Sequence, residues 1–190
     1  MTDIMLDIET LGLKPGAIVV SIGACVFDRT TGEIGGEFYR VIDVADSAAH
    51  GLTIEAGTAM WWIKQSDEAR AVFFDIVEPL ADVAQAFSDW VGAVRRNLPE
   101  PWNGGSGDSP TFWAQGDMDF NVWGAAMDAV GMSRPWAFWA QRDTRTAYDI
   151  CNFDPKAVER DGTYHNALHD ARHQVKCLHL AMRDVIGEIE

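Results

Sequence analysis

Two acidic residues near the start of the chain are spaced so that their side chains share one face. Asp7 and Glu9 follow the apolar run that opens the sequence, and they are two residues apart. On an extended strand, residues two apart point to the same side. Two carboxylates on one side repel each other, so they require a cation, a proton or open water between them.

Three more acidic segments lie where strands are expected to meet helices. They are GDMDF (116–120), RDTR (142–145) and HNALHDA (165–171). Sites in α/β proteins form at strand ends, so carboxylates from these segments are expected to converge with the first pair. Hard oxygen ligands suit Mg²⁺ or Mn²⁺. Two such ions about 3.5–4 Å apart activate a water and stabilise the leaving oxygen in phosphodiester cleavage.

His165 is a candidate general base, five residues before Asp170. Its ordinary pKa of about 6.5 suits proton transfer at neutral pH. A cationic imidazole is disfavoured at a helix N-terminus, so the neutral form that a base requires is expected. Asp143 is interpreted differently, as the N-cap of the helix that follows it.

The segments that must position these groups predict a mixed-sheet α/β fold. Three strand-like segments open the chain and predict an antiparallel meander. Helical and strand-like segments then alternate, which predicts parallel strands flanked by helices. Strands are expected at 1–6, 17–28, 37–43, 111–116 and 137–141, and helices at 53–71, 78–98, 121–131, 144–151 and 166–189. One domain, 1–190, is expected, with a flexible internal loop at 99–110.

Composition limits the class of protein and its compartment. The chain has 190 residues, 47% of them hydrophobic, and a formal net charge of −14. This charge argues against broad attraction to nucleic acid or membrane, although bound cations can offset clustered acids. No apolar run reaches the roughly 18 residues of a membrane span, and no signal peptide is recognisable. With three scattered cysteines, a cytoplasmic protein with reduced thiols is expected; whether it forms a homodimer is left open.

The order and spacing of the motifs resemble the DEDDh exonuclease superfamily. The pattern is D-x-E near the N-terminus, an Asp between strand and helix in mid-chain, and H-x4-D near the C-terminus. The matching segments are MLDIETLGLKPGAIVVSIGACVF, AMWWIKQSDEAR, FWAQGDMDFNVW, RDTRT and YHNALHDA. Together they look most like the exonuclease VIII and mycobacterial-type 3′-5′ exoribonuclease subgroup, which is common in phages. The match covers nearly the whole chain.

The resemblance implies a fold, a reaction and a set of site residues. The fold is ribonuclease H-like. The reaction is two-metal hydrolysis of single-stranded RNA or DNA from the 3′ end, with Mg²⁺ or Mn²⁺, which releases nucleoside 5′-monophosphates. By the same resemblance Asp7, Glu9 and Asp170 are metal ligands, and His165 is the base.

The fourth metal ligand comes from the middle motif, where the chain departs from the subgroup. The subgroup usually has G-x-x-F-D, whereas this sequence has GDMDF. Counting back from Gly131 places Asp119 at the ligand position, with Met118 in the place of the aromatic residue. Asp117 is the competing assignment.

Substrate-binding residues are expected beside the first motif and in the helix that follows. In the superfamily, the residues after D-x-E contact the terminal nucleotide through backbone groups and a wedging side chain, which here implies Thr10 and Leu11. Neighbouring helical residues point about 100° apart, so at least one of Trp61 and Trp62 is expected in the core. The other is a candidate for stacking on a base, and we assign that role to Trp62.

Two other functions remain open on the sequence alone. One is DNA-end processing in phage recombination, as in exonuclease VIII. The other is binding of nucleic acid without catalysis, by a protein that kept the fold. The choice between RNA and DNA also stays open, because it depends on contacts to the 2′-hydroxyl group.

Overall fold

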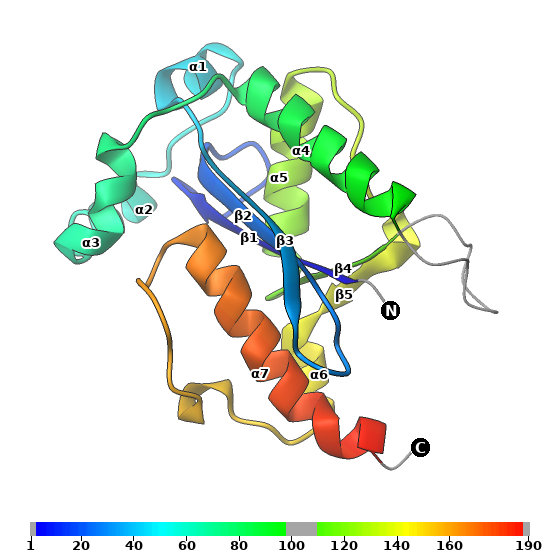
Figure 1. The fold of residues 1–190 in the computed structure, drawn as a ribbon. Coiled ribbons are helices and arrows are strands. Elements are labelled where there is room, and N and C mark those ends of the chain that lie inside the picture. Colours follow the sequence, from blue (N-terminus) through cyan, green and yellow to red (C-terminus); the bar gives the residue numbers. More distant parts are fainter. Residues whose placement is uncertain (1–2, 98–109, 188–190) are drawn as a thin grey trace.

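Five strands form one mixed sheet in the computed structural model of the chain, which describes residues 3–97 and 110–187 (Figure 1). The strands are β1 (Asp3–Thr10), β2 (Val19–Phe27), β3 (Ile34–Val41), β4 (Thr111–Ala114) and β5 (Gln141–Asp143), in the order β3-β2-β1-β4-β5. The first three pair antiparallel, whereas β4 is parallel to β1 and β5 is parallel to β4. The predicted meander followed by parallel strands is therefore confirmed.

Helices cover both faces of this sheet. They are α1 (Val44–Ala49), α2 (Ala56–Trp62), α3 (Asp67–Arg70), α4 (Leu80–Arg96), α5 (Met118–Ala129), α6 (Thr144–Ile150) and α7 (Ala167–Gly187), with short 3-10 turns η1 (Ala71–Phe74), η2 (Phe138–Ala140) and η3 (Pro155–Ala157). Helices α4 and α5 lie on one face, and α6 and α7 on the other (Figure 1). Within the described ranges, no helix combines the length and apolarity that crossing a bilayer would need.

Alternation along β1 divides its side chains between two hydrophobic cores. Leu6 and Ile8 join the core beneath α4 and α5, whereas Met5 joins the core beneath α6 and α7. Asp7 and Glu9 have the parity of Met5, so they face the side of the sheet that α7 covers. Both acids lie within β1, because the strand runs on to Thr10 rather than ending at residue 6 as predicted.

The region expected to be one helix at 53–71 is broken into short pieces. Helix α2 ends at Trp62, and Ser66 then caps α3 by accepting a hydrogen bond from the backbone N–H of Ala69 at 3.2 Å. A capping serine before two acids is itself a helix-start signal, and it outweighs the continuous apolar spacing. The break places α2 against the end of β1 independently of α3.

The prediction of a strand at 137–141 is wrong in its bounds, because the strand in the structure starts only at residue 141. Residues Phe138–Ala140 form a 3-10 turn, and the strand follows at Gln141–Asp143. Phe138 is 82% exposed and Trp139 is 54% exposed, so the apolar run does not mark a buried strand. The loop expected at 99–110 lies, apart from residue 110, outside the described residues.

Gly23 allows α7 to lie directly against the sheet. It pairs with Asp7 in the β1–β2 ladder. A Cβ at this position would lie 2.2 Å from the backbone nitrogen of Leu168 and 2.3 Å from the carbonyl carbon of Ala167. These are backbone atoms at the start of α7, which cannot move aside as a flexible side chain would. Gly23 therefore sets how closely the start of α7 approaches β1.

Gly23→Ala is expected to destabilise the protein by about 1–3 kcal/mol, the usual cost of overpacking, and to lower activity by moving α7 away from β1. Thermal unfolding and turnover check both effects. Gly35→Ala on β3 is the matched control, since a Cβ there would meet nothing closer than 3.8 Å. Equal stability and activity of the two variants would show that the close approach of α7 is unimportant.

Candidate active site

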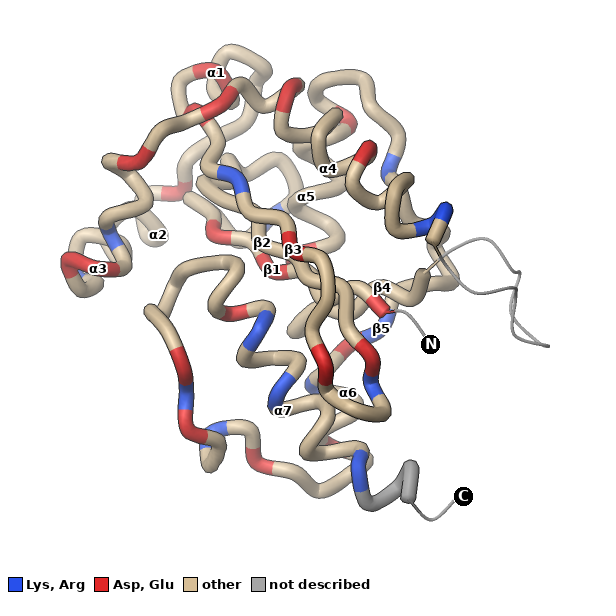
Figure 2. The backbone as a smooth tube through the Cα atoms, in the orientation of Figure 1, with Lys and Arg blue, Asp and Glu red and all other residues tan. Residues whose placement is uncertain are grey.

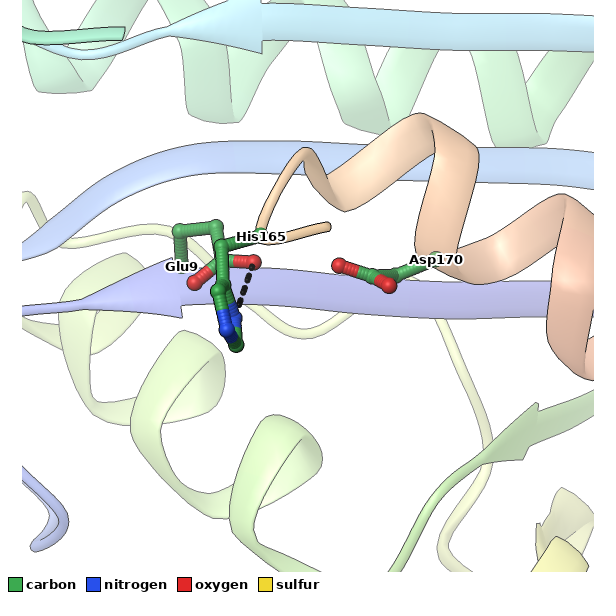
Figure 3. Close-up of side chains that lie close together, drawn as sticks. All are labelled: Glu9, His165 and Asp170. Atoms are coloured by element: carbon green, nitrogen blue, oxygen red, sulfur yellow. Dashed lines mark ion pairs between the residues drawn. The ribbon is translucent and has the colours of Figure 1, made fainter. Parts of the chain in front are cut away.

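Glu9, His165 and Asp170 meet at the carboxyl end of β1 (Figure 3). One potential ligand atom from each of them lies within 4.8 Å of the others. Glu9 comes from β1, Asp170 from the first turn of α7, and His165 from the segment just before that helix. The structure thus brings together three residues that the sequence motifs single out at opposite ends of the chain.

Asp119 reaches the same place from α5, which lies on the face of the sheet opposite α7. It lies in the first turn of α5, is 4% exposed, and its Oδ1 accepts a hydrogen bond from the backbone N–H of Ile8 at 3.2 Å. Ile8 lies between Asp7 and Glu9, so this bond fixes Asp119 beside both acids. Asp117 instead is exposed, and its carboxylate accepts a hydrogen bond from Asn121 at 3.1 Å.

The acids of the cluster are buried in an environment that disfavours their ionised forms. Burial, reinforced by the charge of Asp119, raises the pKa of Glu9 to about 8. Burial also raises the pKa of Asp119 to about 7, and burial together with the charges of Asp119 and Glu9 holds the pKa of Asp7 well above its ordinary value. Carboxylates in such an environment require protons or cations. Divalent cations would supply the missing positive charge.

His165 adopts an unusual backbone conformation and faces Glu9. Its φ of 59° lies in the left-handed region, which His adopts more readily than most residues. Its Nδ1 atom lies 3.9 Å from Oε1 of Glu9, the contact drawn in Figure 3. Burial, with a smaller effect from the charge of Arg160, lowers the pKa of His165 below its ordinary value. The imidazole is therefore neutral at pH 7, as a general base requires.

A cavity of about 360 Å³ adjoins Glu9. It is lined by Ile8, Glu9, Thr10, Leu13, Gly57, Thr58, Trp61 and Met118. Most of these groups are apolar, and Trp61 adds the edge or face of an aromatic ring. A flat group of the size of a nucleobase suits such a lining.

Trp61, rather than Trp62, presents an aromatic ring to this cavity. Trp62 is only 3% exposed, and its Nε1 donates a hydrogen bond to the backbone oxygen of Thr10 at 2.8 Å. Trp61 is 41% exposed and lies edge-to-face against the His165 ring, with centroids 4.8 Å apart. The assignment of Trp62 to base stacking is therefore corrected, since Trp62 supports the strand end from inside the core.

Leu13, rather than Leu11, presents its side chain to the cavity, where a wedging residue was expected. Leu11 is 6% exposed and is absent from the cavity lining, whereas Leu13 is 64% exposed and lines it. The chain turns back after β1, so that the Leu11 backbone N–H pairs with the oxygen of Ile18 at 2.8 Å. This return buries Leu11 and exposes Leu13. Thr10 lines the cavity, and its contact with the terminal nucleotide stays a prediction.

The comparisons with known proteins agree with this geometry. A family model described as the 3′-5′ exoribonuclease Rv2179c-like domain matches residues 2–182. The chain belongs to this family. The Rv2179c-like domain thus spans nearly the whole chain, and the expected kinship with 3′-5′ exonucleases is confirmed.

Curated relatives and solved structures similar to the Rv2179c-like domain are exonucleases. The exodeoxyribonuclease of Enterobacteria phage T4 is 25% identical over 222 residues, covering 98% of this chain and 92% of that protein. The nuclease domain of 3′hExo, a DEDDh family member bound to rAMP, has a TM-score of 0.61 at 12% identity, covering 96% of this chain and 92% of that one. E. coli Exonuclease I in complex with a dT13 oligonucleotide has a TM-score of 0.65 at 14% identity, covering 99% of this chain and 43% of that one.

The ribonuclease H-like fold and the activity of the Rv2179c-like domain follow from these findings. The mixed sheet flanked by helices is the fold of DEDDh exonucleases. The protein is a nuclease, a 3′-5′ exonuclease of the kind that depends on divalent metal ions. Binding of nucleic acid without catalysis, the non-enzymatic alternative of the sequence analysis, is set aside.

Besides Leu13, two polar residues of the Rv2179c-like site were not anticipated from the sequence. Gln174 donates a hydrogen bond from Nε2 to Oδ1 of Asp7 at 2.7 Å. It is four residues after Asp170, hence on the same face of α7, and this spacing was the available signal. Arg160 forms an ion pair with Asp170. Arg160 lies in an irregular segment, so the periodic spacing of helix or strand residues could not predict that it belongs to the site.

Two basic residues along α7 are paired with acids. Arg172 forms an ion pair with Glu37 on β3 at 2.5 Å, and Lys176 forms one with Asp161 at 2.9 Å. Figure 2 shows that basic positions on α7 lie among acidic positions of neighbouring segments. Their charges are balanced within the protein, so Arg172 and Lys176 are not a free path for a phosphate backbone.

Asp119→Asn is expected to reduce turnover far more than Asp117→Asn. Asp119 is buried beside Asp7 and Glu9. Asp117 is exposed, and its carboxylate accepts a hydrogen bond from the side chain of Asn121. Removing one ligand of a metal pair costs several kcal/mol of transition-state stabilisation, or about 10³-fold in rate. The two variants serve as each other's control, because they make the same change two residues apart. The reverse order of effects would assign Asp117 to the metal.

The metal-free protein is expected to lose stability as pH rises from about 4 to about 8. Asp and Glu ionise near pH 4 in an unfolded chain, whereas Glu9 and Asp119 ionise in the folded chain near 8 and 7. The folded state then keeps protons that the unfolded state has lost, so its stability falls across this interval. Thermal unfolding at several pH values in chelator measures the effect.

Two comparisons control this pH experiment. Glu9→Gln removes one of the shifted groups, so the fall in stability between pH 5 and pH 8 should be smaller in this variant. Saturating Mn²⁺ should reverse the fall in the wild-type protein, because the cations replace the protons. A metal-free wild-type protein whose unfolding temperature rises over this range would contradict the electrostatic description of the cluster.

Proposed function

We propose that this exonuclease hydrolyses single-stranded RNA and DNA from the 3′ end and releases nucleoside 5′-monophosphates. The observation that carries the proposal is the convergence of Glu9, His165 and Asp170 beside a cavity lined by Trp61 and Leu13. An aromatic and apolar lining offers a stacking surface to a base, and this surface accepts any base. A single strand presents its terminal base to such a cavity, whereas a duplex keeps that base paired.

We further propose that the acidic cluster holds two Mg²⁺ or Mn²⁺ ions. The donor set fits these ions, because it consists of carboxylate oxygens from Asp7, Glu9, Asp119 and Asp170. The raised pKa values of Glu9 and Asp119 support the assignment, because burial disfavours their ionised forms and a bound cation would stabilise them. When bound, the ions would supply activation of the attacking water and stabilisation of the leaving 3′ oxygen.

The remaining roles belong to side chains around this cluster. His165 accepts the proton of the attacking water, for which its neutral ring is suited. Trp61 and Leu13 hold the terminal base, and Trp62 fixes the backbone of Thr10 through its Nε1–H. Gln174 orients the carboxylate of Asp7. Positioning of this kind contributes to the rate by holding reacting groups in place.

DNA-end processing in phage recombination remains the alternative. The relative that favours it is the exodeoxyribonuclease of Enterobacteria phage T4, which is similar over 98% of this chain. The family model that matches the chain is instead described as an exoribonuclease domain. Because the two names point to different nucleic acids, the substrate has to be determined directly.

A time course on equal-sequence RNA and DNA oligonucleotides tests the proposal. Each strand carries a label at its 5′ end in one series and at its 3′ end in another, with Mg²⁺ or Mn²⁺ present. We expect the 3′ label to appear at once as a mononucleotide and the 5′ label to shorten stepwise, with no reaction in chelator. Internal cuts, or early loss of the 5′ label, would refute the proposal. Faster cleavage of duplex DNA than of either single strand would favour DNA-end processing.

We also propose that the protein works in the cytoplasm. The three cysteines, Cys25, Cys151 and Cys177, are all free thiols, and two of them are buried. This pattern supports a reducing compartment. Fractionation of the host cell followed by detection of the protein would test it.

A further inference from the structure

Arg160 lies inside the acidic site. It belongs to the segment between η3 and α7, which also carries His165. Its side chain is 13% exposed, and its Nη2 atom forms an ion pair with Oδ1 of Asp170. Its charge also acts on Asp7 and Glu9. Arg160 is therefore a positive charge placed among the carboxylates of the site.

A second contact holds the guanidinium group in place. Its central carbon lies 4.3 Å from the centre of the Tyr164 ring, within the range of a cation–π contact. Tyr164 directly precedes His165, whose backbone is in the left-handed region. Arg160 thus joins the segment that carries the base to the helix that carries Asp170.

The ion pair leaves Asp170 able to bind a cation. A carboxylate has two oxygens and about four lone pairs, so an arginine on Oδ1 does not exhaust it. Carboxylates that bind metals are commonly oriented by a partner of this kind. Arginine suits the task because its planar group has a fixed geometry and keeps its charge when buried.

We propose that Arg160 is a positioning residue that fixes the carboxylate of Asp170 for metal binding and ties it to the His165 segment. The inference rests on the proposed metal site, because orienting Asp170 matters only if Asp170 binds an ion. In this role Arg160 touches neither an ion nor the nucleic acid. Without it Asp170 turns more freely, so metal affinity and turnover both fall.

Calorimetric titration with Mn²⁺ tests this role directly. Arg160→Gln is expected to bind Mn²⁺ about 10–100-fold more weakly than the wild-type protein, the usual effect of losing a residue that orients a metal ligand. Arg160→Lys keeps the charge without the planar fork, so it should recover part of the affinity. Arg172→Gln is the matched control, since its ion pair with Glu37 lies on the half-exposed side of α7. That variant should bind Mn²⁺ as the wild-type protein does.

Steady-state kinetics on an oligonucleotide give a second readout. Arg160→Gln should have a lower kcat that rises again with Mn²⁺ concentration, at an unchanged KM for the oligonucleotide. Thermal unfolding in chelator identifies a folding defect, and if Arg160→Gln does not fold, Arg160→Lys carries the test. Unchanged or tighter Mn²⁺ binding by the variants would overturn the inference and make Arg160 inert or a competitor of the ion. A raised KM with unchanged Mn²⁺ affinity would also overturn it, because Arg160 would then contact the substrate phosphate.

The two proposals fail in different ways. If the wild-type protein binds no Mn²⁺, the proposed metal site is wrong. If the wild-type protein and Arg160→Gln bind Mn²⁺ equally well, only the inference about Arg160 is wrong.

Discussion

Asp7→Ala and Glu9→Ala should each lower kcat by at least about 10³-fold, because each removes a ligand of the ions that stabilise the transition state by several kcal/mol. Both residues lie on the face of β1 that α7 covers, and the pKa of each is raised by burial and by neighbouring carboxylates. Removing one carboxylate relieves repulsion, so metal-free stability should be kept or increased. Turnover on a single-stranded oligonucleotide and thermal unfolding in chelator measure the two effects.

Glu33→Ala is the control for this pair of variants. Glu33 is an exposed acid before β3, so its loss changes the net charge equally without touching the site. Its turnover should equal that of the wild-type protein. Near-normal turnover of Asp7→Ala or Glu9→Ala would remove that residue from the metal site, and unfolding of either variant in chelator would give it a structural role instead.

His165→Ala should slow cleavage by roughly 10²–10⁴-fold, the usual loss on removing a general base, while Mn²⁺ binding stays nearly intact. The side chain is close to Glu9 and Asp170, so its ligand atom is within reach of the same ion. We expect it to act on the attacking water and not on the metal. Wild-type activity should fall as pH drops through the His165 pKa, which lies below the ordinary value, and this acid limb should vanish in the variant.

His165→Asn controls for the backbone of this position. Asn adopts a φ near 59° more easily than Ala does, so it tests the imidazole without adding strain. The two variants should be equally slow, and calorimetry should give both of them nearly wild-type Mn²⁺ affinity. Lost Mn²⁺ binding in both would make His165 a ligand. An unchanged rate in both would transfer the base function to another group, such as the Tyr164 hydroxyl.

The parts of the site that sequence could predict are those that regular elements place. Asp7 and Glu9 share a face because strands alternate, and Asp170 lies at the start of a helix with a strong apolar stripe. Asp119 follows a short buried strand, so its position after β4 could be counted from the end of the helix at Gly131. Once the sheet was predicted as one mixed sheet, these acids had to meet at the carboxyl ends of its parallel strands.

Residues whose position depends on a turn or a cap were predicted less well. The sequence predicts contact with substrate for Leu11 and Trp62, yet the return of the chain after β1 buries Leu11, and the angle of α2 buries Trp62. The spacing of residues along the sequence shows neither how far the chain turns inward after β1 nor how a short helix such as α2 is rotated about its axis. Phe138 shows the same limit, because an exposed apolar residue is indistinguishable in sequence from a buried one.

Anomalous diffraction from crystals grown with Mn²⁺ is the most direct test of the metal site. We expect two strong peaks about 3.5–4 Å apart, each from an ion bound by the carboxylates of Asp7, Glu9, Asp119 and Asp170, and no peak in crystals of Asp7→Ala. Soaking with a short single strand that ends in an uncleavable linkage should then place the terminal base against Trp61 and Leu13. No peak at the acidic cluster, or peaks bound by other residues while the protein remains active, would contradict the account.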